Sequence, residues 1–248
     1  MKILVFGAGV LGCNLARNFF RAGKDVTLLA RGAWGESIPK NGLRIKDKFS
    51  PRMSVSRIPV TAELKAEDKY DVIFIVLRYT QLDAILDTLR TNPTKNIVFV
   101  GNDVRASALS ASLPEKNVMF AFASSAGHRE REYVASVDLK KLKDNTAYLS
   151  RLIDANIESY RAIKNAGHEI LPKDDAEFEG AAYRKTCLRF FKLMSATSLG
   201  KICASDHAMN AVDEMSALNR DLKAFFDENG AKYSVWQELE QEVAKYLK

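Results

Sequence analysis

The chain has 248 residues, enough for one large domain or two modest ones. Hydrophobic residues make up 47% and charged residues 27%, proportions that are ordinary for a soluble globular protein. The net charge of +6 is spread along the chain, with no arginine-rich tail and no nucleic-acid-binding motif. We therefore expect anionic small molecules, and no nucleic acid, as partners.

The cysteines and histidines argue against a disulfide framework and against a metal site. Cys13, Cys187 and Cys203 lie far apart and form no C-x-x-C pair, and the three histidines are scattered as well. The chain opens with an apolar strand pattern and no signal peptide, and no apolar run approaches the length of a membrane span. We therefore expect a cytoplasmic protein with no metal and no membrane partner.

The most informative pattern lies at the start of the chain. Residues 3–6 form an unbroken apolar run, as is typical of a strand buried on both faces. Gly7, Gly9 and Gly12 follow at G-x-G-x-x-G spacing, and a helical repeat of apolar residues then runs to Gly23. Residues 26–29 form a second apolar run. This strand–turn–helix–strand order is the context in which the glycine motif predicts a dinucleotide-binding site.

Each glycine of the motif has a physical reason. Gly7 allows a tight turn, Gly9 lets the backbone approach a pyrophosphate, and Gly12 lets the helix pack closely on the strand. Val10 and Leu11 begin the helix, where unpaired N–H groups and the helix dipole favour the phosphates. The flanking strands and helix favour this interpretation over a glycine-rich turn that binds nothing.

The residue after the second strand predicts which dinucleotide is bound. NAD-binding versions usually carry Asp or Glu there, which bonds the ribose 2′-hydroxyl. This chain carries Arg31, whose guanidinium suits the 2′-phosphate of NADPH. A charge-assisted contact of about 1.5–3 kcal/mol favours NADPH over NADH by roughly ten- to a hundredfold. The alternative interpretation is an arginine on a solvated loop.

Strands and helices continue to alternate to about residue 122. Three further apolar runs predict buried strands, at residues 72–77, 97–100 and 118–122. Residues 80–90 predict a helix with one apolar face. This succession predicts an α/β fold with a doubly wound, Rossmann-type, mostly parallel sheet.

The stretch from residue 32 to 70 is less regular. Residues 43–45 and 54–60 are candidates for short strands, and prolines are expected to interrupt helix at Pro39, Pro51 and Pro59. Residues 124–148 show only a weak pattern.

From about residue 150 the pattern is mainly helical. A helix is expected to run to Asn165, followed by a last strand at residues 168–171. Beyond Pro172 three helical segments are expected, at residues 174–194, 206–229 and 234–247. We predict a Rossmann domain over residues 1–172 that binds NADP. A smaller all-helical domain over residues 173–248 would serve substrate binding and dimerisation.

The opening of the chain, MKILVFGAGVLG, resembles that of the ketopantoate reductase family. The end of the second strand, VTLLARG, and the later segment NGLRI also look like the family. Family members reduce 2-dehydropantoate to pantoate with NADPH in pantothenate biosynthesis, and they consist of a Rossmann domain followed by a helical domain. The resemblance is clear over about the first 125 residues and fainter from residue 155 to about 230.

The resemblance implies further cofactor residues in the Rossmann domain. The family places a lysine, and soon after it a glutamine, behind the strand equivalent to residues 72–77. This chain has Arg78 and Gln81 there. The alternative for Arg78 is a solvated arginine at a helix start. The family also has an Asn-Gly pair near the nicotinamide. Here Asn102 is kept, and Asp103 replaces the glycine, which tolerates a positive φ far better.

The resemblance also implies a catalytic lysine in the second domain. The family carries it in a Trp-Arg-Lys context, and the matching YRK segment of this chain ends at Lys185. Asparagines stand four and eight residues later in the family, where this chain has Arg189 and Leu193. Helical spacing sets Lys185, Arg189 and Lys192 opposite a face formed by Tyr183, Cys187, Phe190, Phe191 and Met194. By spacing alone the stripe suits a solvated helix face, and the resemblance favours a catalytic role for Lys185 only.

These expectations describe an NADPH-dependent reductase of a small 2-oxo acid. Lys185 would be the general acid, Asn102 would place the nicotinamide or the carbonyl, and Arg189 or Arg78 would bind the substrate carboxylate. One alternative is an NADP(H)-binding paralogue without this activity, with a sensing or scaffold role. Another is an opine-type dehydrogenase with an amino-acid co-substrate. A homodimer formed through the helical domain is expected. The later Ser and Glu of the family have no convincing match, and Glu214, Glu238 and Glu240 stay unassigned.

Overall fold

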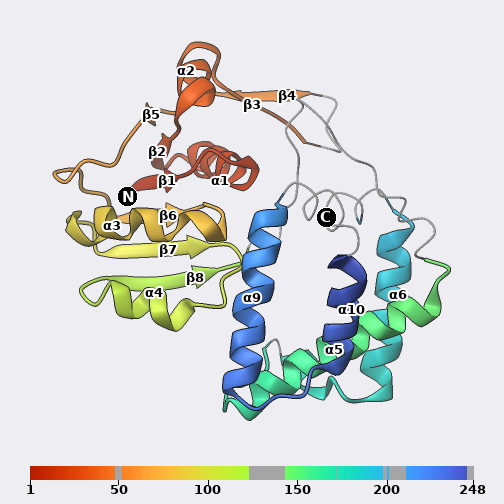
Figure 1. Ribbon diagram of the computed structural model, residues 1–248. Helices are drawn as coiled ribbons and strands as arrows, with labels where there is room; N and C mark the ends of the chain where they lie inside the picture. Colours follow the sequence, from red (N-terminus) through yellow and green to blue (C-terminus); the bar gives the residue numbers. More distant parts are fainter. Residues whose placement is uncertain (48–51, 123–142, 172, 198–199, 201–210, 245–248) are drawn as a thin grey trace. The chain divides into compact units, whose positions relative to one another are not determined.

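The computed structural model describes the chain except for residues 48–51, 123–142, 172, 198–199, 201–210 and 245–248. The chain divides into two compact units, Met1–Arg131 and Glu132–Lys248. Figure 1 shows the strands in the first unit and the long helices in the second. The boundary expected after residue 172 falls inside the second unit, and residue 172 itself lies outside the described residues.

A six-stranded parallel sheet forms the first unit, in the order β5-β2-β1-β6-β7-β8. The strands are β1 (Lys2–Phe6), β2 (Asp25–Leu29), β5 (Val60–Thr61), β6 (Val72–Ile75), β7 (Asn96–Val100) and β8 (Asn117–Ala121). β1 pairs with β2 on one side and with β6 on the other, so the strand order reverses beside it. In doubly wound sheets, ligands bind at the carboxyl ends of the strands at this point.

Helices cover both faces of the sheet. Ile3 and Val5 point toward α1 (Val10–Arg21), where they join Ala16 in one core cluster. Leu4 and Phe6 belong to a second cluster with Leu89 of α3 (Leu86–Thr91) and Leu109 of α4 (Ala106–Ser112). Because both faces of β1 are buried from Ile3 to Phe6, these four residues form a continuous apolar run without alternation. The predicted doubly wound α/β fold is confirmed.

The helix expected over residues 80–90 is divided into shorter pieces. Two 3₁₀ turns, η1 (Tyr79–Gln81) and η2 (Asp83–Ile85), precede α3. The amide oxygen of Gln81 accepts a hydrogen bond from the backbone N–H of Arg78 at 3.1 Å, which closes the first turn. The expected apolar face is nonetheless buried, with Leu82, Ile85 and Leu89 in the core.

The irregular stretch after β2 contains one helix that the sequence did not predict, because a proline lies within it. α2 (Gly32–Asn41) includes Pro39, which was expected to interrupt helix. Pro39 lies in the last turn, where it removes a single hydrogen bond and leaves the earlier turns intact. β3 (Leu43–Lys46) and β4 (Met53–Ser56) then form an antiparallel pair, and β4 and β5 replace the single strand expected at residues 54–60. Pro51 lies outside the described residues.

The described part of the second unit is helical. Its elements are α5 (Thr146–Asn165), η4 (Lys173–Glu177), α6 (Ala181–Ser195), α9 (Val212–Glu228) and α10 (Ser234–Ala244). α5 contacts α6, α9 and α10, which explains why it groups with the helices that follow it and not with the sheet. None of the described helices is both long and apolar enough to cross a membrane.

The strand expected at residues 168–171 is absent from the described structure. The segment is a loop that is held by one side chain: Ile170 is 7% exposed and packs with Ile153, Ile157 and Phe178, whereas the residues on either side of it are exposed. The segment has only two apolar residues, Ile170 and Leu171, and a pattern this short does not separate a strand from a loop anchored by one side chain.

Candidate functional site

The glycine-rich turn connects the carboxyl end of β1 to the start of α1. Gly7 has a φ of +121°, and a Cβ at this position would lie 2.3 Å from the carbonyl oxygen of Val76. A Cβ at Gly12 would lie 1.9 Å from the carbonyl oxygen of Gly7. Neither contact is sterically possible, so the fold alone requires glycine at these two positions.

Gly9 differs from its two neighbours in the motif. Its φ of −70° suits any residue, and a Cβ there would have nothing within 4 Å. A glycine that the fold does not require, facing open space, fits a group that approaches the backbone from outside, as a pyrophosphate does. Val10 and Leu11 begin α1, whose first turn in the described structure has neither an acidic residue nor a side-chain cap. The amides of this turn therefore suit an anion.

Arg31 stands at the carboxyl end of the neighbouring strand. β2 ends at Leu29, Ala30 follows, and Arg31 occupies the N-cap position of α2. Its side chain is exposed, and the guanidinium carbon lies 6.0 Å from the ring centroid of Phe6 on β1. Because β1 and β2 are adjacent and parallel, Arg31 and the glycine turn lie at the same edge of the sheet. These residues fit a phosphorylated dinucleotide laid across that edge.

The loops after β6 and β7 carry the other expected cofactor residues. Arg78 and Gln81 are exposed at the η1 turn, and Asn102 is exposed in the loop that follows β7. Since β6 and β7 are also adjacent and parallel, both loops lie at the carboxyl edge as well. The structure thus brings the expected cofactor residues of the first unit to one edge of one sheet.

The loop around Asn102 shows how the chain accommodates Asp103 where the family has glycine. The positive φ occurs at Gly101, at +158°, one residue before Asn102. The carboxylate of Asp103 accepts a hydrogen bond from the backbone N–H of Arg105 at 2.6 Å, which closes the loop. The turn therefore uses a glycine before the asparagine and an aspartate after it.

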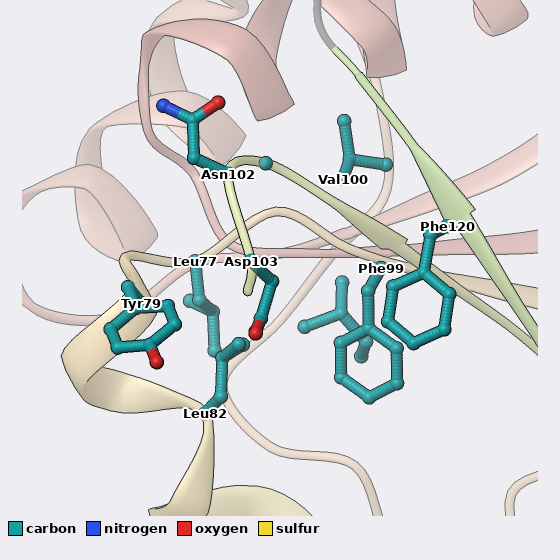
Figure 2. A pocket seen from close by; sticks show the side chains of 10 residues that line it. Leu77, Tyr79, Leu82, Phe99, Val100, Asn102, Asp103 and Phe120 are labelled. Carbon is teal, nitrogen blue, oxygen red and sulfur yellow. The ribbon is translucent and has the colours of Figure 1, made fainter. Parts of the chain in front are cut away.

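A small pocket lies behind this loop (Figure 2). Its cavity volume is only about 10 Å³, and it is lined mainly by apolar side chains that include Leu82, Phe99 and Phe120. The Phe99 and Phe120 rings stack with centroids 5.7 Å apart. Figure 2 shows Asp103 directed toward these side chains and Asn102 directed away from them. This volume has room for about one water molecule and none for a ligand. The pocket is continuous with the core, so its side chains support the loop.

The expected catalytic lysine lies on α6 in the second unit. Lys185 and Arg189 are both exposed, while Tyr183, Cys187 and Phe191 pack against α5. The helix is anchored by Arg184, which donates to Asp154 Oδ2 at 3.0 Å, and by Asn156 Nδ2, which donates to the Tyr183 hydroxyl at 3.1 Å. Burial, together with hydrogen bonding to Cys187 and Tyr160, raises the pKa of Tyr183.

One part of the expected α6 pattern is wrong. Phe190 was placed on the buried face, but its side chain is 55% exposed, and Leu193 is 64% exposed. The helix packs on a narrower face than the sequence suggested: the side chains that it buries meet α5 and the loop around Phe178. Lys185 and Arg189 therefore share the exposed side of α6 with two large apolar side chains.

Two of the three unassigned carboxylates, Glu238 and Glu240, join helices to one another. Glu240 of α10 accepts hydrogen bonds from Lys223 at 2.8 Å and from Asn219 at 2.6 Å, and the hydrogen bond from Lys223 lowers the pKa of Glu240. Glu238 pairs with Arg151 of α5 at 3.3 Å. Glu214 is 8% exposed. Among the described residues, no group of His, Cys, Asp or Glu could hold a metal ion.

A family model described as ketopantoate reductase PanE/ApbA matches residues 3–141, more than half of the chain. The chain belongs to this family. The resemblance stated from the sequence is therefore confirmed, and the ketopantoate reductase family is one of NAD(P)-dependent 2-oxo acid reductases.

Two curated members of the family match parts of the chain. A 2-dehydropantoate 2-reductase of Mesorhizobium japonicum is 38% identical over 92 residues, which is 36% of this chain and 27% of that protein. A 2-dehydropantoate 2-reductase of Lactococcus lactis is 24% identical over 146 residues, which is 48% of this chain and 46% of that protein. The chain thus matches less than half the length of these relatives.

Several solved structures match the fold over the whole chain. The 2-dehydropantoate 2-reductase of Geobacter metallireducens has a TM-score of 0.63 at 15% identity, covering 99% of this chain and all of that one. A probable 2-dehydropantoate 2-reductase of Bacillus subtilis has 0.62 at 14%, with both chains fully covered. A D-mandelate dehydrogenase complex has 0.62 at 13%, covering 99% and 97%. At these identities the likeness shows the shared fold, a parallel sheet followed by a helical region.

Sequence reasoning missed Arg105 in the loop after β7. No pattern singled it out, because its partners Tyr79 and Asp83 lie more than twenty residues earlier and meet it only in the folded sheet. The only local signal is the spacing of Asp103 and Arg105, which suits an aspartate that closes a turn.

Proposed function

We propose that the protein is an NADPH-dependent reductase of a 2-oxo acid, with ketopantoate as the first substrate to test. The observation that carries the proposal is the contrast within the glycine motif. Gly7 and Gly12 are required by packing, whereas Gly9 faces open space beside the first turn of α1, which has no side-chain cap and no acidic residue. Such an arrangement is explained by a pyrophosphate that would collide with a Cβ at Gly9.

The preference for NADPH is supported by Arg31. It stands at the end of β2, where NAD-type sites carry an acidic residue, and the segment from Leu29 to Gly32 contains no acid. An exposed guanidinium beside the start of α2 provides a bidentate donor for a 2′-phosphate. The D-mandelate dehydrogenase that shares the fold was solved with NADH, so the preference has to be measured for this chain.

The first unit would bind the cofactor and the second would supply the substrate residues. When bound, NADPH supplies the hydride that reduces a carbonyl carbon. Lys185 would donate a proton to the oxygen as negative charge develops there. Arg189, one turn later on the same exposed side of α6, would bind the substrate carboxylate, and Arg78 is the alternative donor. Asn102 would hold the nicotinamide amide or the carbonyl from the loop after β7.

The class of substrate is better supported than ketopantoate itself. The neighbouring D-mandelate dehydrogenase structure contains anilino(oxo)acetate, also a 2-oxo acid. On α6, however, Arg189 and the 64% exposed Leu193 stand where the family has asparagines. We also propose a homodimer, because α6 exposes Phe190 and Leu193 and because a dimeric ketopantoate reductase of Staphylococcus aureus shares the fold with a TM-score of 0.58 at 13% identity.

The test is NADPH oxidation, followed by absorbance, with ketopantoate and a panel of other 2-oxo acids. We expect turnover with at least one member of the panel and slower turnover when NADH replaces NADPH. Tight NADPH binding without turnover on any 2-oxo acid would favour the alternative, an NADP(H)-binding paralogue with a sensing or scaffold role. Failure to bind either nucleotide would contradict both functions.

A further inference from the structure

Arg105 joins two loops that follow different strands. It precedes α4, and its side chain reaches back to the turns that follow β6. Nη1 donates to both carboxylate oxygens of Asp83, at 3.1 and 3.0 Å, and Nη2 donates to the carbonyl oxygen of Tyr79 at 3.4 Å. The guanidinium carbon also lies 4.2 Å from the centroid of the Tyr79 ring, within cation–π range. Arg105 is thus bound to both η1 and η2.

Asp103 holds Arg105 from the other side. Its Oδ1 accepts the backbone N–H of Arg105 at 2.6 Å and lies 3.9 Å from the Nε of the same residue. The Asp103 side chain is 6% exposed and that of Arg105 27%, so water screens this pair less than a surface pair. Asp103 lies next to Asn102, and the two side chains point to opposite sides of the loop in Figure 2. Fixing Asp103 therefore also fixes the backbone from which Asn102 projects.

The two loops joined by Arg105 form one half of the candidate cofactor edge. Arg78 and Asn102 lie after β6 and β7, whereas the glycine turn and Arg31 lie after β1 and β2. With Arg31 at the 2′-phosphate, the adenosine half of NADPH would lie over β1 and β2. The nicotinamide half would then extend toward the Arg78 and Asn102 loops.

We propose that Arg105 is a positioning residue that holds the Arg78 turn and the Asn102 loop in the relation needed to bind the nicotinamide half of NADPH. This inference rests on the proposed function. Arg105 acts through Tyr79, Asp83 and Asp103, and all its contacts given above are to protein groups. A purely structural role would lower stability without favouring one half of the cofactor over the other, so the two roles can be separated.

The experiment compares dissociation constants for NADPH and for 2′,5′-ADP, which carries the 2′-phosphate and lacks the nicotinamide. Arg105→Ala should weaken NADPH binding about tenfold, as expected when displaced loops lose about one hydrogen bond to the nicotinamide half, and leave 2′,5′-ADP within about twofold. Arg105→Lys keeps the charge but loses the planar guanidinium, so its NADPH affinity should lie between that of the wild type and that of Arg105→Ala.

Arg90→Ala is the matched control. Arg90 also joins two elements of the first unit. From α3, its Nε and Nη2 donate to the carbonyl oxygen of Ser112 at the end of α4, at 3.3 and 3.2 Å. This bridge lies just before the amino ends of β7 and β8, away from the cofactor edge. Arg90→Ala should leave both affinities unchanged even if the melting temperature falls.

If Arg105→Ala fails to fold, Arg105→Lys and Asp83→Asn carry the same comparison with smaller expected shifts. Equal weakening of NADPH and 2′,5′-ADP, or no change in either, would overturn the inference while leaving the proposed function in place. A wild-type protein that binds neither nucleotide would overturn the proposed function and the inference together.

Discussion

The glycine turn of the first unit and the exposed side of α6 in the second constrain their residues in different ways. At Gly7 and Gly12, backbone atoms lie so close that only glycine fits, and at Gly9 the space is open. On α6, the side chains of Lys185 and Arg189 are exposed, so the helix could carry many other residue types at these two positions. The turn proposed to bind the cofactor is therefore constrained by backbone packing at two of its three glycines, whereas the proposed substrate residues depend on which side chains occupy a helix surface.

Loss of Lys185 tests the substrate half and has the largest expected effect. Lys185→Ala should reduce turnover about 10²- to 10⁴-fold, because a general acid contributes that much, and should leave the NADPH dissociation constant unchanged. Lys192→Ala, on the same helix, is the control and should remain near wild type. An equal loss of NADPH affinity in Lys185→Ala would contradict the division between the two halves.

Arg31 tests cofactor choice in the first unit. Arg31→Ala should weaken NADPH binding roughly ten- to a hundredfold and leave NADH binding unchanged, because only NADPH carries the 2′-phosphate. Fluorescence titration of both nucleotides measures this ratio. Arg21→Ala, which removes an exposed arginine from the last turn of α1, should preserve it. A parallel loss of NADH affinity would show that Arg31 acts on the fold.

The two kinds of glycine can be separated by paired substitutions. Gly9→Ala should leave the free energy of unfolding within about 0.5 kcal/mol of wild type. Its NADPH affinity should fall about 5- to 100-fold, the range expected when a methyl group overpacks a site. Gly12→Ala should destabilise the protein by about 1–3 kcal/mol, since its Cβ would meet the Gly7 carbonyl. Normal NADPH binding by a folded Gly9→Ala protein would remove the main support for the cofactor site.

The smallest effect concerns the helical framework that carries α6. The hydrogen bond from Lys223 lowers the pKa of Glu240 from 4.5 in the folded protein. The contribution of this pair to the free energy of unfolding is therefore complete above pH 4.5, and it is lost as the pH falls through the lowered pKa of the folded state. Glu240→Gln should cost about 1 kcal/mol at neutral pH, and the difference from wild type should shrink in acid. Urea unfolding at a series of pH values measures both. A difference that stays constant into acid would contradict the assigned ion pair.

The contrast between packed backbone and exposed side chains also explains what could be predicted from the sequence. The β1–turn–α1 unit was predictable because glycine spacing and a two-sided apolar strand leave a direct mark on residue type. The division of the helix at residues 79–91 was not, because it depends on local closure by Gln81 and on the contact of Asp83 with Arg105. The grouping of α5 with the second unit depends likewise on contacts with α10, nearly ninety residues away in the chain.

The role proposed for Lys185 on α6 rests on the family resemblance, and it stays a prediction. Helical spacing placed Lys185 and Arg189 on one stripe correctly, but it also assigned Phe190 to a buried face, where it is not found. Periodicity gives the direction of a side chain and not the width of the face that neighbouring helices cover. The substrate half of the site therefore has to be established by chemistry.

The most direct test of the central claim is transfer of a labelled hydride in a single turnover. NADPH carrying deuterium at both C4 positions of the nicotinamide is mixed with the protein and the 2-oxo acid that supports the fastest oxidation, and the product is analysed by mass spectrometry. The account predicts a 2-hydroxy acid that carries the deuterium at C2, formed much more slowly by Lys185→Ala. Oxidation of NADPH without label in the product, or no oxidation with any 2-oxo acid, would contradict it.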